Sequence, residues 1–284
     1  MTGAARAVAG QGGAARIVLV ALALGLTALL IGLPLVVIFV QAFSKGVAGY
    51  LEALNSPDMR HAVYLTLVVA VLSVPANIAF GIAAAWAIAR FRFPGRSLLV
   101  VLIELPLSVS PVVAGVCYLL LYGSQGLFGP FLEAQGIQLM FALPGIVMVT
   151  IFVTCPYVAR EVLPLMEEQG KDEEETAVTL GARGWHILWR VTLPNIRWAL
   201  LYGAILCTAR AIGEFGAVSV VSGNVRGVTN TLPLQVELLY HSYNVVGAFT
   251  AATLLTLIAL VALGAKAIVE RMGAAATAEQ RRGR

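Results

Sequence analysis

Apolar residues dominate six long segments of the chain, and most charged residues fall between them. The segments are residues 17–43, 61–89, 97–122, 139–159, 198–225 and 238–265, the last spanning from about residue 245. A bilayer core about 30 Å thick needs about 20 apolar residues in a helix that rises 1.5 Å per residue. The segments also lack the alternation typical of membrane β-strands. The pattern therefore predicts an all-α membrane protein with six transmembrane helices.

The first apolar segment sets the expected domain boundaries. It is longer than the apolar core of a secretory signal, usually about 7–15 residues, so we expect it to be retained as a helix. The preceding residues are rich in Gly and Ala without periodicity, which is typical of disorder. The expected units are a disordered tail at 1–16, one transmembrane domain at 17–270 and a basic tail at 271–284.

Composition and charge agree with a membrane protein. Of the 284 residues, 59% are hydrophobic and 12% charged, and the mean hydropathy is +0.87. Soluble domains carry about 25% charged residues, so an ordinary soluble domain is excluded. Most of the 19 Lys and Arg residues lie in the two tails and in the linkers 90–96 and 160–197. Cytoplasmic loops retain such an excess, so we expect both termini and these linkers to be cytoplasmic, and no nucleic-acid partner.

The linker 160–197 is long and strongly patterned. Acidic residues gather at its start, which suits a helix N-terminus, and apolar residues then recur at helical spacing. Gly181 and Gly184 interrupt the spacing, as glycines in a left-handed turn do. The residue before a proline avoids helical backbone, so Pro194 is expected to end the second helix. The linker therefore predicts two short helices with a turn between them.

Two tryptophans on the second helix suggest a contact surface. Trp185 and Trp189 are four residues apart, so their rings should share one helix face. Such an apolar ridge suits docking in a groove of a partner protein. Packing against the protein's own helix ends and the lipid headgroups is an equal alternative from these residues alone.

The same linker resembles the EAA loop of bacterial ABC-importer permeases. That loop reads E-A-A, three residues, G, nine residues, I, one residue, L-P; here it begins at Glu175 and its glycine is Gly181. Thr176 and Val191 replace the first Ala and the Ile conservatively. The resemblance implies that residues 161–194 dock on a cytoplasmic ATPase subunit. The residues expected to form this coupling loop's contact are Glu175, Thr176, Ala177, Leu180, Gly181, Trp185, Val191, Leu193 and Pro194.

The following residues resemble the sulfate/molybdate branch of these permeases. The stretches 195–224 and 232–244 are most similar to the W-type subunit of sulfate/thiosulfate importers, and the overall resemblance covers about residues 42–266. It implies a type I ABC-importer permease fold in a bacterial inner membrane. It also implies a T-type second permease, an ATPase dimer that binds ATP and magnesium, and a periplasmic or extracytoplasmic binding protein. A homodimeric molybdate or tungstate permease is the alternative.

Two opposite charges lie inside the fifth apolar segment. Arg210 and Glu214 are at i and i+4, so one helix would place them on the same face, where pairing would lower the cost of burial. Gly213 and Gly216 flank the acid and permit close approach of another helix. A structural clamp, a gate that rearranges during transport and direct substrate contact are the possible roles. The acid would repel a dianion, so substrate contact is the least favoured.

Glu104 is an unpaired acid in the third segment. Two following prolines, Pro106 and Pro111, can break the helix at mid-depth, where irregular backbone normally lines a cavity. Serine hydroxyls near such a path could donate to an oxyanion, although bonds to their own helix carbonyls are their commoner role. The serines considered for the path are Ser108, Ser110, Ser219 and Ser222.

No pattern of catalysis or of cofactor binding is present in the sequence. It has no P-loop, no nucleophile elbow and no metal-ligand spacing, so we expect a non-catalytic subunit that binds no cofactor or metal. A self-sufficient channel or secondary transporter and a membrane anchor are the other classes. Neither needs a docking loop, so we favour an ATPase-driven permease that works by alternating access. The resemblance to W-type subunits implies that it imports sulfate or thiosulfate.

Overall fold

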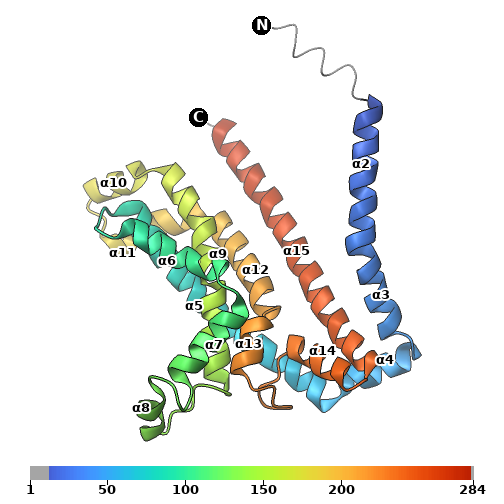
Figure 1. The fold of residues 1–284 in the computed structure, drawn as a ribbon. Helices are drawn as coiled ribbons and strands as arrows, with labels where there is room; N and C mark the ends of the chain where they lie inside the picture. The colour runs from blue at the N-terminus through green and yellow to red at the C-terminus, as the bar shows by residue number, and fades with distance from the viewer. Residues whose placement is uncertain (1–12, 283–284) are drawn as a thin grey trace.

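The computed structural model describes residues 13–282, with side chains from 16 to 273, and is helical throughout its ordered elements (Figure 1). Residues 1–12, most of the expected disordered tail, lie outside this range, and the first helix already begins at Gly13. The helices are α2 (Gly13–Thr27), the π turn η1 (Ala28–Gly32), α3 (Leu33–Ala42), α4 (Gly46–Asn55), α5 (Pro57–Arg90), α6 (Arg96–Ser108), α7 (Pro111–Tyr122), α8 (Gly129–Ala134), α9 (Leu143–Gln169), α10 (Asp172–Thr179), α11 (Gly184–Ile187), the π turn η2 (Leu188–Thr192), α12 (Leu193–Ile212), α13 (Gly216–Val221), α14 (Leu232–His241) and α15 (Val245–Arg282).

The all-α membrane fold is confirmed, while the count of six spans remains a prediction. Within residues 13–282, four helical stretches are long and apolar enough to cross a membrane: Arg16–Ala42, Pro57–Arg90, Leu143–Gln169 and Val245–Gly273. The pair α6 and α7 makes a fifth candidate. The remaining predicted segment, 198–225, is not one helix, because the chain breaks between α12 and α13.

The third apolar segment breaks as its prolines predicted. α6 ends at Ser108, α7 begins at Pro111, and the two helices are bent by 109°. Pro106 stays inside α6, so Pro111 alone marks the break. A proline fits the first turn of a helix, whose N–H groups have no helical partner in any case. The segment therefore enters the bundle as two half-helices.

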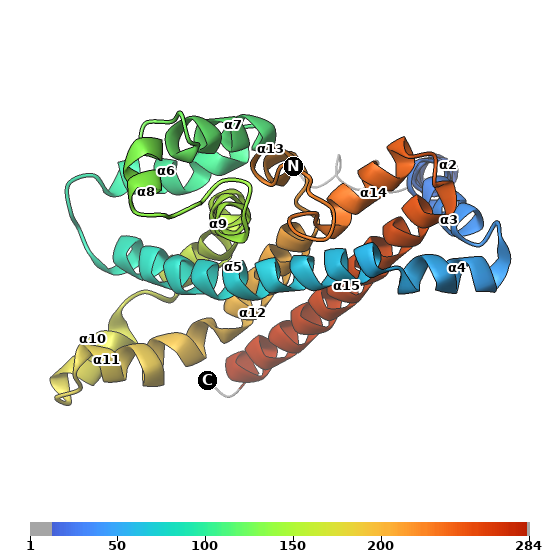
Figure 2. The same cartoon turned by 90° about the horizontal axis from the view of Figure 1, so that it is seen from below.

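Helices α5, α9 and α12 form the centre of the bundle (Figures 1 and 2). Gly81 of α5 lies so close to α9 that a Cβ there would approach Val158 Cγ1 to 2.7 Å. A buried polar contact joins the three helices: the Asn77 amide donates to Thr154 Oγ1 at 2.7 Å and to Cys207 Sγ at 3.6 Å. Close backbone approach and a shared polar contact are how membrane helices associate where the solvent is itself apolar.

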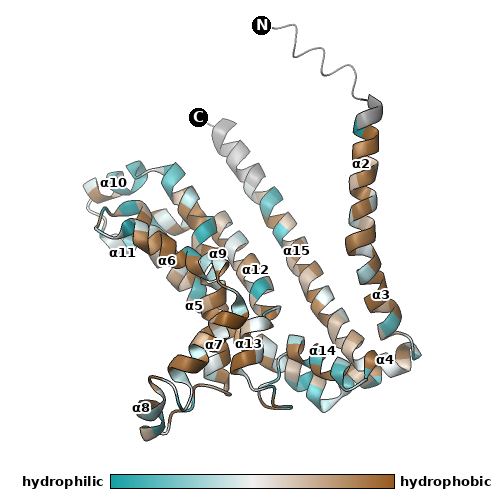
Figure 3. Ribbon diagram, in the orientation of Figure 1, coloured by the Kyte–Doolittle hydropathy of each residue, from teal (hydrophilic) through white to brown (hydrophobic). Residues whose placement is uncertain are grey.

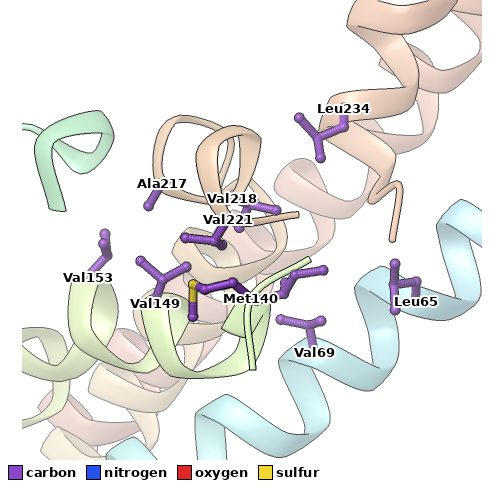
Figure 4. Packing of buried hydrophobic residues seen from close by; sticks show 10 residues of the cluster. Leu65, Val69, Met140, Val149, Val153, Ala217, Val218, Val221 and Leu234 are labelled. Atoms are coloured by element: carbon purple, nitrogen blue, oxygen red, sulfur yellow. The ribbon is translucent and has the colours of Figure 1, made fainter. Parts of the chain in front are cut away.

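A second core holds the half-helix α13 in place (Figure 4). Ala217, Val218 and Val221 of α13 pack with Val149 and Val153 of α9, together with apolar side chains from α5 and α14. α13 also lies against α7, since a Cβ on Gly115 would come within 2.8 Å of the Ala217 carbonyl oxygen. Six residues are too few for a stable isolated helix, so this packing supplies the order of α13.

The first transmembrane stretch stands apart from the bundle (Figures 1 and 3). α2 is apolar on all sides, and none of the most apolar window of Arg16–Ala42 is buried within the chain. Only its lower part, α3, packs against α15, and α4 leads the chain back to α5. A helix that is apolar all round requires lipid or an apolar protein surface around it.

The elements divide between two ends of the bundle. The start of α2, the end of α15 and the short helices α10 and α11 lie at one end, while α4, α8 and α14 lie at the other (Figure 1). α15 continues to Arg282, so most of the expected C-terminal tail is helical, and residues 283–284 lie outside the described range. The cytoplasmic location of the first end remains a prediction from the charge distribution.

Candidate functional site

The fourth linker forms the predicted pair of short helices. α10 carries four acids in its first turn, and Gly181 follows it with φ +84°, the left-handed conformation that a glycine adopts most easily. Gly184 is not part of this turn, because it begins α11. We call residues 172–189, which include both tryptophans, the docking hairpin.

The second helix does not end at Pro194, so that expectation was wrong. Backbone at Thr192 (φ −66°, ψ −53°) and Leu193 (φ −62°, ψ −44°) is helical, and α11, η2 and α12 follow one another without a break. A proline has no N–H and its ring clashes with the carbonyl four residues earlier. The π turn η2 widens the helix just before Pro194 and avoids that clash. The π turn η1 stands in the same position before Pro34.

Glu174 fastens the docking hairpin to the membrane helices. Its Oε2 accepts from Arg90 Nε at 2.7 Å, and its Oε1 accepts from Thr192 Oγ1 at 2.8 Å. Arg90 also donates to the Met166 carbonyl at 2.8 Å, and Lys171 Nζ donates to the Arg90 carbonyl at 2.6 Å. Sequence reasoning missed this cluster, because Glu174 is one of several adjacent acids and Arg90 lies far away in the chain.

The opposite side of the docking hairpin presents apolar side chains to solvent. Leu180 is 83% exposed, and Trp185 and Trp189 are 67% and 56% exposed with ring centroids 5.6 Å apart. Ile187 points inward and is buried, which fixes the orientation of α11. The tryptophans therefore share one face as predicted. The chain's own helix ends do not cover them, and the choice between a partner protein and the lipid headgroups stays open.

The other residues of the predicted coupling loop divide between the surface and the interior. Glu175, Thr176, Gly181 and Pro194 are exposed, whereas Ala177, Val191 and Leu193 are half-buried. Ala177 lies on α10, Val191 in η2 and Leu193 at the start of α12, so the half-buried members are spread over three elements. Their contact with an ATPase remains a prediction.

Arg210 and Glu214 form the expected ion pair, but not along one helix. Arg210 Nη1 lies 2.5 Å from Glu214 Oε2, and the Glu214 side chain is 1% exposed. α12 ends at Ile212, so the pair bridges the break to α13. Glu214 Oε1 also accepts from the Ala217 backbone N–H at 2.9 Å, which caps the N-terminus of α13. The acid thus neutralises Arg210 and occupies the helix terminus that would otherwise attract an anion.

The two helix breaks adjoin each other. A Cβ on Gly216, at the start of α13, would lie 3.3 Å from Pro111 Cβ at the start of α7. Gly216 therefore permits the close approach expected of it, whereas Gly213 is exposed and nearest only to its own helix at the Ala209 carbonyl. Two half-helices begin side by side here, next to the Arg210–Glu214 pair.

The candidate path serines have mostly local partners. Ser108 donates to the Leu105 carbonyl and Ser219 to the Gly216 carbonyl, each at 2.9 Å. Ser222 is buried and lies 3.1 Å from the Asn224 side-chain oxygen. Ser110 is exposed at the start of α7. Ser108 and Ser219 therefore bond to carbonyls of their own helices, which is the commoner role of such serines. Contact with a substrate remains a prediction for all four serines.

The fold and the exposed hairpin define a multi-pass membrane protein of the transport class. The family model described as "Binding-protein-dependent transport system inner membrane component" matches residues 77–273, so the chain belongs to that family. The match runs from the middle of α5 to the end of the apolar part of α15. It includes the docking hairpin, both helix breaks and Glu104.

Curated relatives agree with this family, and a solved structure shares the fold. It is 56% identical over 252 residues to the sulfate transport system permease protein CysW of Escherichia coli strain K12, covering 89% of this chain and 87% of the relative. It is 34% identical over 227 residues to CysT of the same strain, covering 80% and 82%. A bacterial ABC transporter that imports alginate has the same fold, with a TM-score of 0.73, 17% identity and coverage of 90% and 93%.

Proposed function

We propose that this chain is a permease subunit of an ATP-driven importer that moves sulfate or thiosulfate into the cytoplasm. The alignment with CysW, which includes nearly the whole chain, carries the proposal. Cyanobacterial relatives named CysW agree with it at 52% and 50% identity. These names favour sulfate over the molybdate alternative, and an importer subunit over a self-sufficient channel.

The docking hairpin couples the chain to a separate ATPase. Trp185 and Trp189 offer large aromatic surface, and aromatic anchors that insert into a partner's groove commonly dominate such interfaces. Glu174 and Arg90 hold the hairpin to the helix ends, so a displacement of the hairpin is passed to α5 and α12. ATP and magnesium bind on the ATPase, and this chain contributes no catalytic group.

Transport proceeds by alternating access around the two helix breaks. Irregular backbone at membrane depth is stable where it is buried in protein or lines a water-filled path. The breaks before Pro111 and Gly216 adjoin, and the Arg210–Glu214 pair bridges the second one. We infer that this region is the gate and that the ion pair is a clamp within it. The anion moves past the gate when the helices tilt.

The complete importer contains three further kinds of subunit in the bacterial inner membrane or on its surfaces. A CysT-like permease pairs with this chain, since the chain also resembles CysT. A cytoplasmic ATPase dimer binds at the docking hairpin. A periplasmic binding protein delivers the anion, by analogy with the alginate transporter solved with its periplasmic protein.

Uptake of radiolabelled sulfate tests the proposed substrate. Cells lacking only this gene should lose uptake and regain it from a plasmid, and thiosulfate should compete while molybdate should not. Unchanged sulfate uptake together with lost molybdate accumulation would instead indicate the molybdate importer.

Co-purification of the ATPase with Trp185→Ala tests the docking hairpin. We expect binding to weaken by about 2 kcal/mol, which is typical of a central aromatic contact, with membrane insertion unchanged. Trp198→Ala changes the same residue type on α12, beyond the hairpin, and serves as the control. Equal loss of the ATPase in both variants would refute a specific contact at the hairpin.

A further inference from the structure

A groove between α6 and α9 contains two opposite charges that are not paired with each other. Its volume is about 460 Å³, and it is lined by Val101, Glu104, Leu105, Leu107, Ser108 and Arg160. The linker was expected to begin at residue 160, but α9 continues to Gln169, so Arg160 lies within the helix. An arginine therefore faces the groove from one helix and an acid from the other.

Arg160 and Glu104 lie at similar distances along their helices from the same end of the bundle. Arg160 is nine residues before the end of α9 and Glu104 eight residues after the start of α6, which places both about 12–14 Å from the same end of the bundle. That end also carries the docking hairpin (Figure 1). The groove therefore belongs to the half of the membrane nearest the predicted cytoplasmic side.

The guanidinium of Arg160 has no ion-pair partner within 4.0 Å among the described side chains, 16–273, and the carboxylate of the adjacent Glu161 interacts with it only at longer range. The Arg160 side chain is exposed. Arg210 differs, because Glu214 already neutralises it at 2.5 Å. Of these two arginines, Arg160 is the one whose charge is available to an anion.

The charges also indicate what fills the groove. Ionisable side chains within membrane-spanning helices face water or protein, because exposure to lipid tails is unfavourable. A volume of about 460 Å³ holds several waters, each occupying about 30 Å³ in the liquid. Ser108, the last residue of α6, also lines the groove, and the break before Pro111, part of the proposed gate, follows it in the chain. An aqueous path that leads away from the gate fits this position.

We propose that Arg160 is a transit site for the divalent oxyanion on its way from the gate to the cytoplasm, with Glu104 limiting how tightly the anion is held. Arginine offers planar, paired donors suited to an oxyanion. A conduction site must attract the ion and still release it, and an acid in the same groove weakens the attraction. This inference rests on the proposed function, because it assumes that the transported ligand is an oxyanion.

Variants of the reconstituted importer test the transit site. The complete complex of both permeases, the ATPase and the binding protein is placed in proteoliposomes, and radiolabelled sulfate uptake and ATP hydrolysis are measured together. Arg160→Gln should lower uptake about tenfold or more, as expected for loss of a charge-assisted contact. ATP hydrolysis stimulated by the sulfate-loaded binding protein should persist, and Arg160→Lys should retain most uptake.

The control is Arg92→Gln, which removes an exposed arginine beyond the end of α5, outside the groove. Wild-type uptake by the assembled Arg160→Gln complex would overturn the inference. Failure of Arg160→Gln to assemble would also overturn it, since the groove would then be a contact between subunits. A wild-type complex that moves no sulfate would instead contradict the proposed function.

Discussion

Replacing Glu174 by Gln measures how firmly the docking hairpin is attached. The substitution keeps the side-chain shape but removes the charge that contacts Arg90 at 2.7 Å and Thr192 at 2.8 Å. The Arg90 and Glu174 side chains are only 9% and 14% exposed, so solvent screens them little. A hydrogen bond to a charged group is worth about 1.5–3 kcal/mol. The hairpin should therefore detach about 10 to 140 times more often, at a factor of ten per 1.4 kcal/mol.

Hydrogen exchange of the α10 amides, compared between purified Glu174→Gln and wild-type protein, measures directly how much more often the hairpin detaches. α10 has eight residues and is too short to persist alone, so its amides exchange when the hairpin detaches. Glu167→Gln is the matched control, because its pair with Arg96 has the same 2.7 Å distance but is 44% and 48% exposed. Exposed ion pairs contribute about 0–1 kcal/mol, so Glu167→Gln should change the exchange rate of the α10 amides by less than about fivefold. Equal effects of the two variants would refute the assignment of Glu174 as the anchor.

Three further substitutions test the packing and the turns. In a thermal unfolding assay, Arg210→Met should destabilise the protein by about 3–5 kcal/mol, because Glu214 is then left buried and unpaired. Adding Glu214→Gln should recover part of the loss. Gly81→Ala should cost about 1–3 kcal/mol, because its Cβ would meet Val158 at 2.7 Å, whereas Gly25→Ala meets nothing within 4 Å and should be neutral in the same assay. Gly181→Ala should loosen the hairpin by about 1–2 kcal/mol in the exchange assay, because its φ is +84°, while Gly184→Ala, with helical backbone, should not.

Features determined locally could be predicted from the sequence. A spanning helix requires a long apolar run, so the apolar segments located the long helices within a few residues at most ends. The break before Pro111 and the left-handed turn at Gly181 follow from the chemistry of single residues. The spacing of Trp185 and Trp189 likewise predicted a shared face, because four residues are about one helical turn.

Features that depend on distant parts of the chain could not be predicted. Glu174 finds Arg90 only after α5, α9 and α10 have folded together, and nothing in the local sequence distinguishes it from the acids beside it. Pro194 was expected to end a helix, but the π turn η2 just before it lets the helix continue into α12. Arg160 was assigned to a linker because arginine usually lies outside the bilayer. Only the length of α9 places it in a groove.

The π turn before Pro194 has a mechanical consequence. α11, η2 and α12 make one helical run that extends from Trp185 on the docking hairpin to Arg210 at the proposed gate, about 40 Å at 1.5 Å per residue. If Pro194 had ended the helix, a flexible joint would lie between the docking hairpin and Arg210. An unbroken helical run is stiff, so a small tilt imposed at the end that carries the docking hairpin becomes a displacement at its far end. The π turn and the proline after it are where this helical run bends most easily.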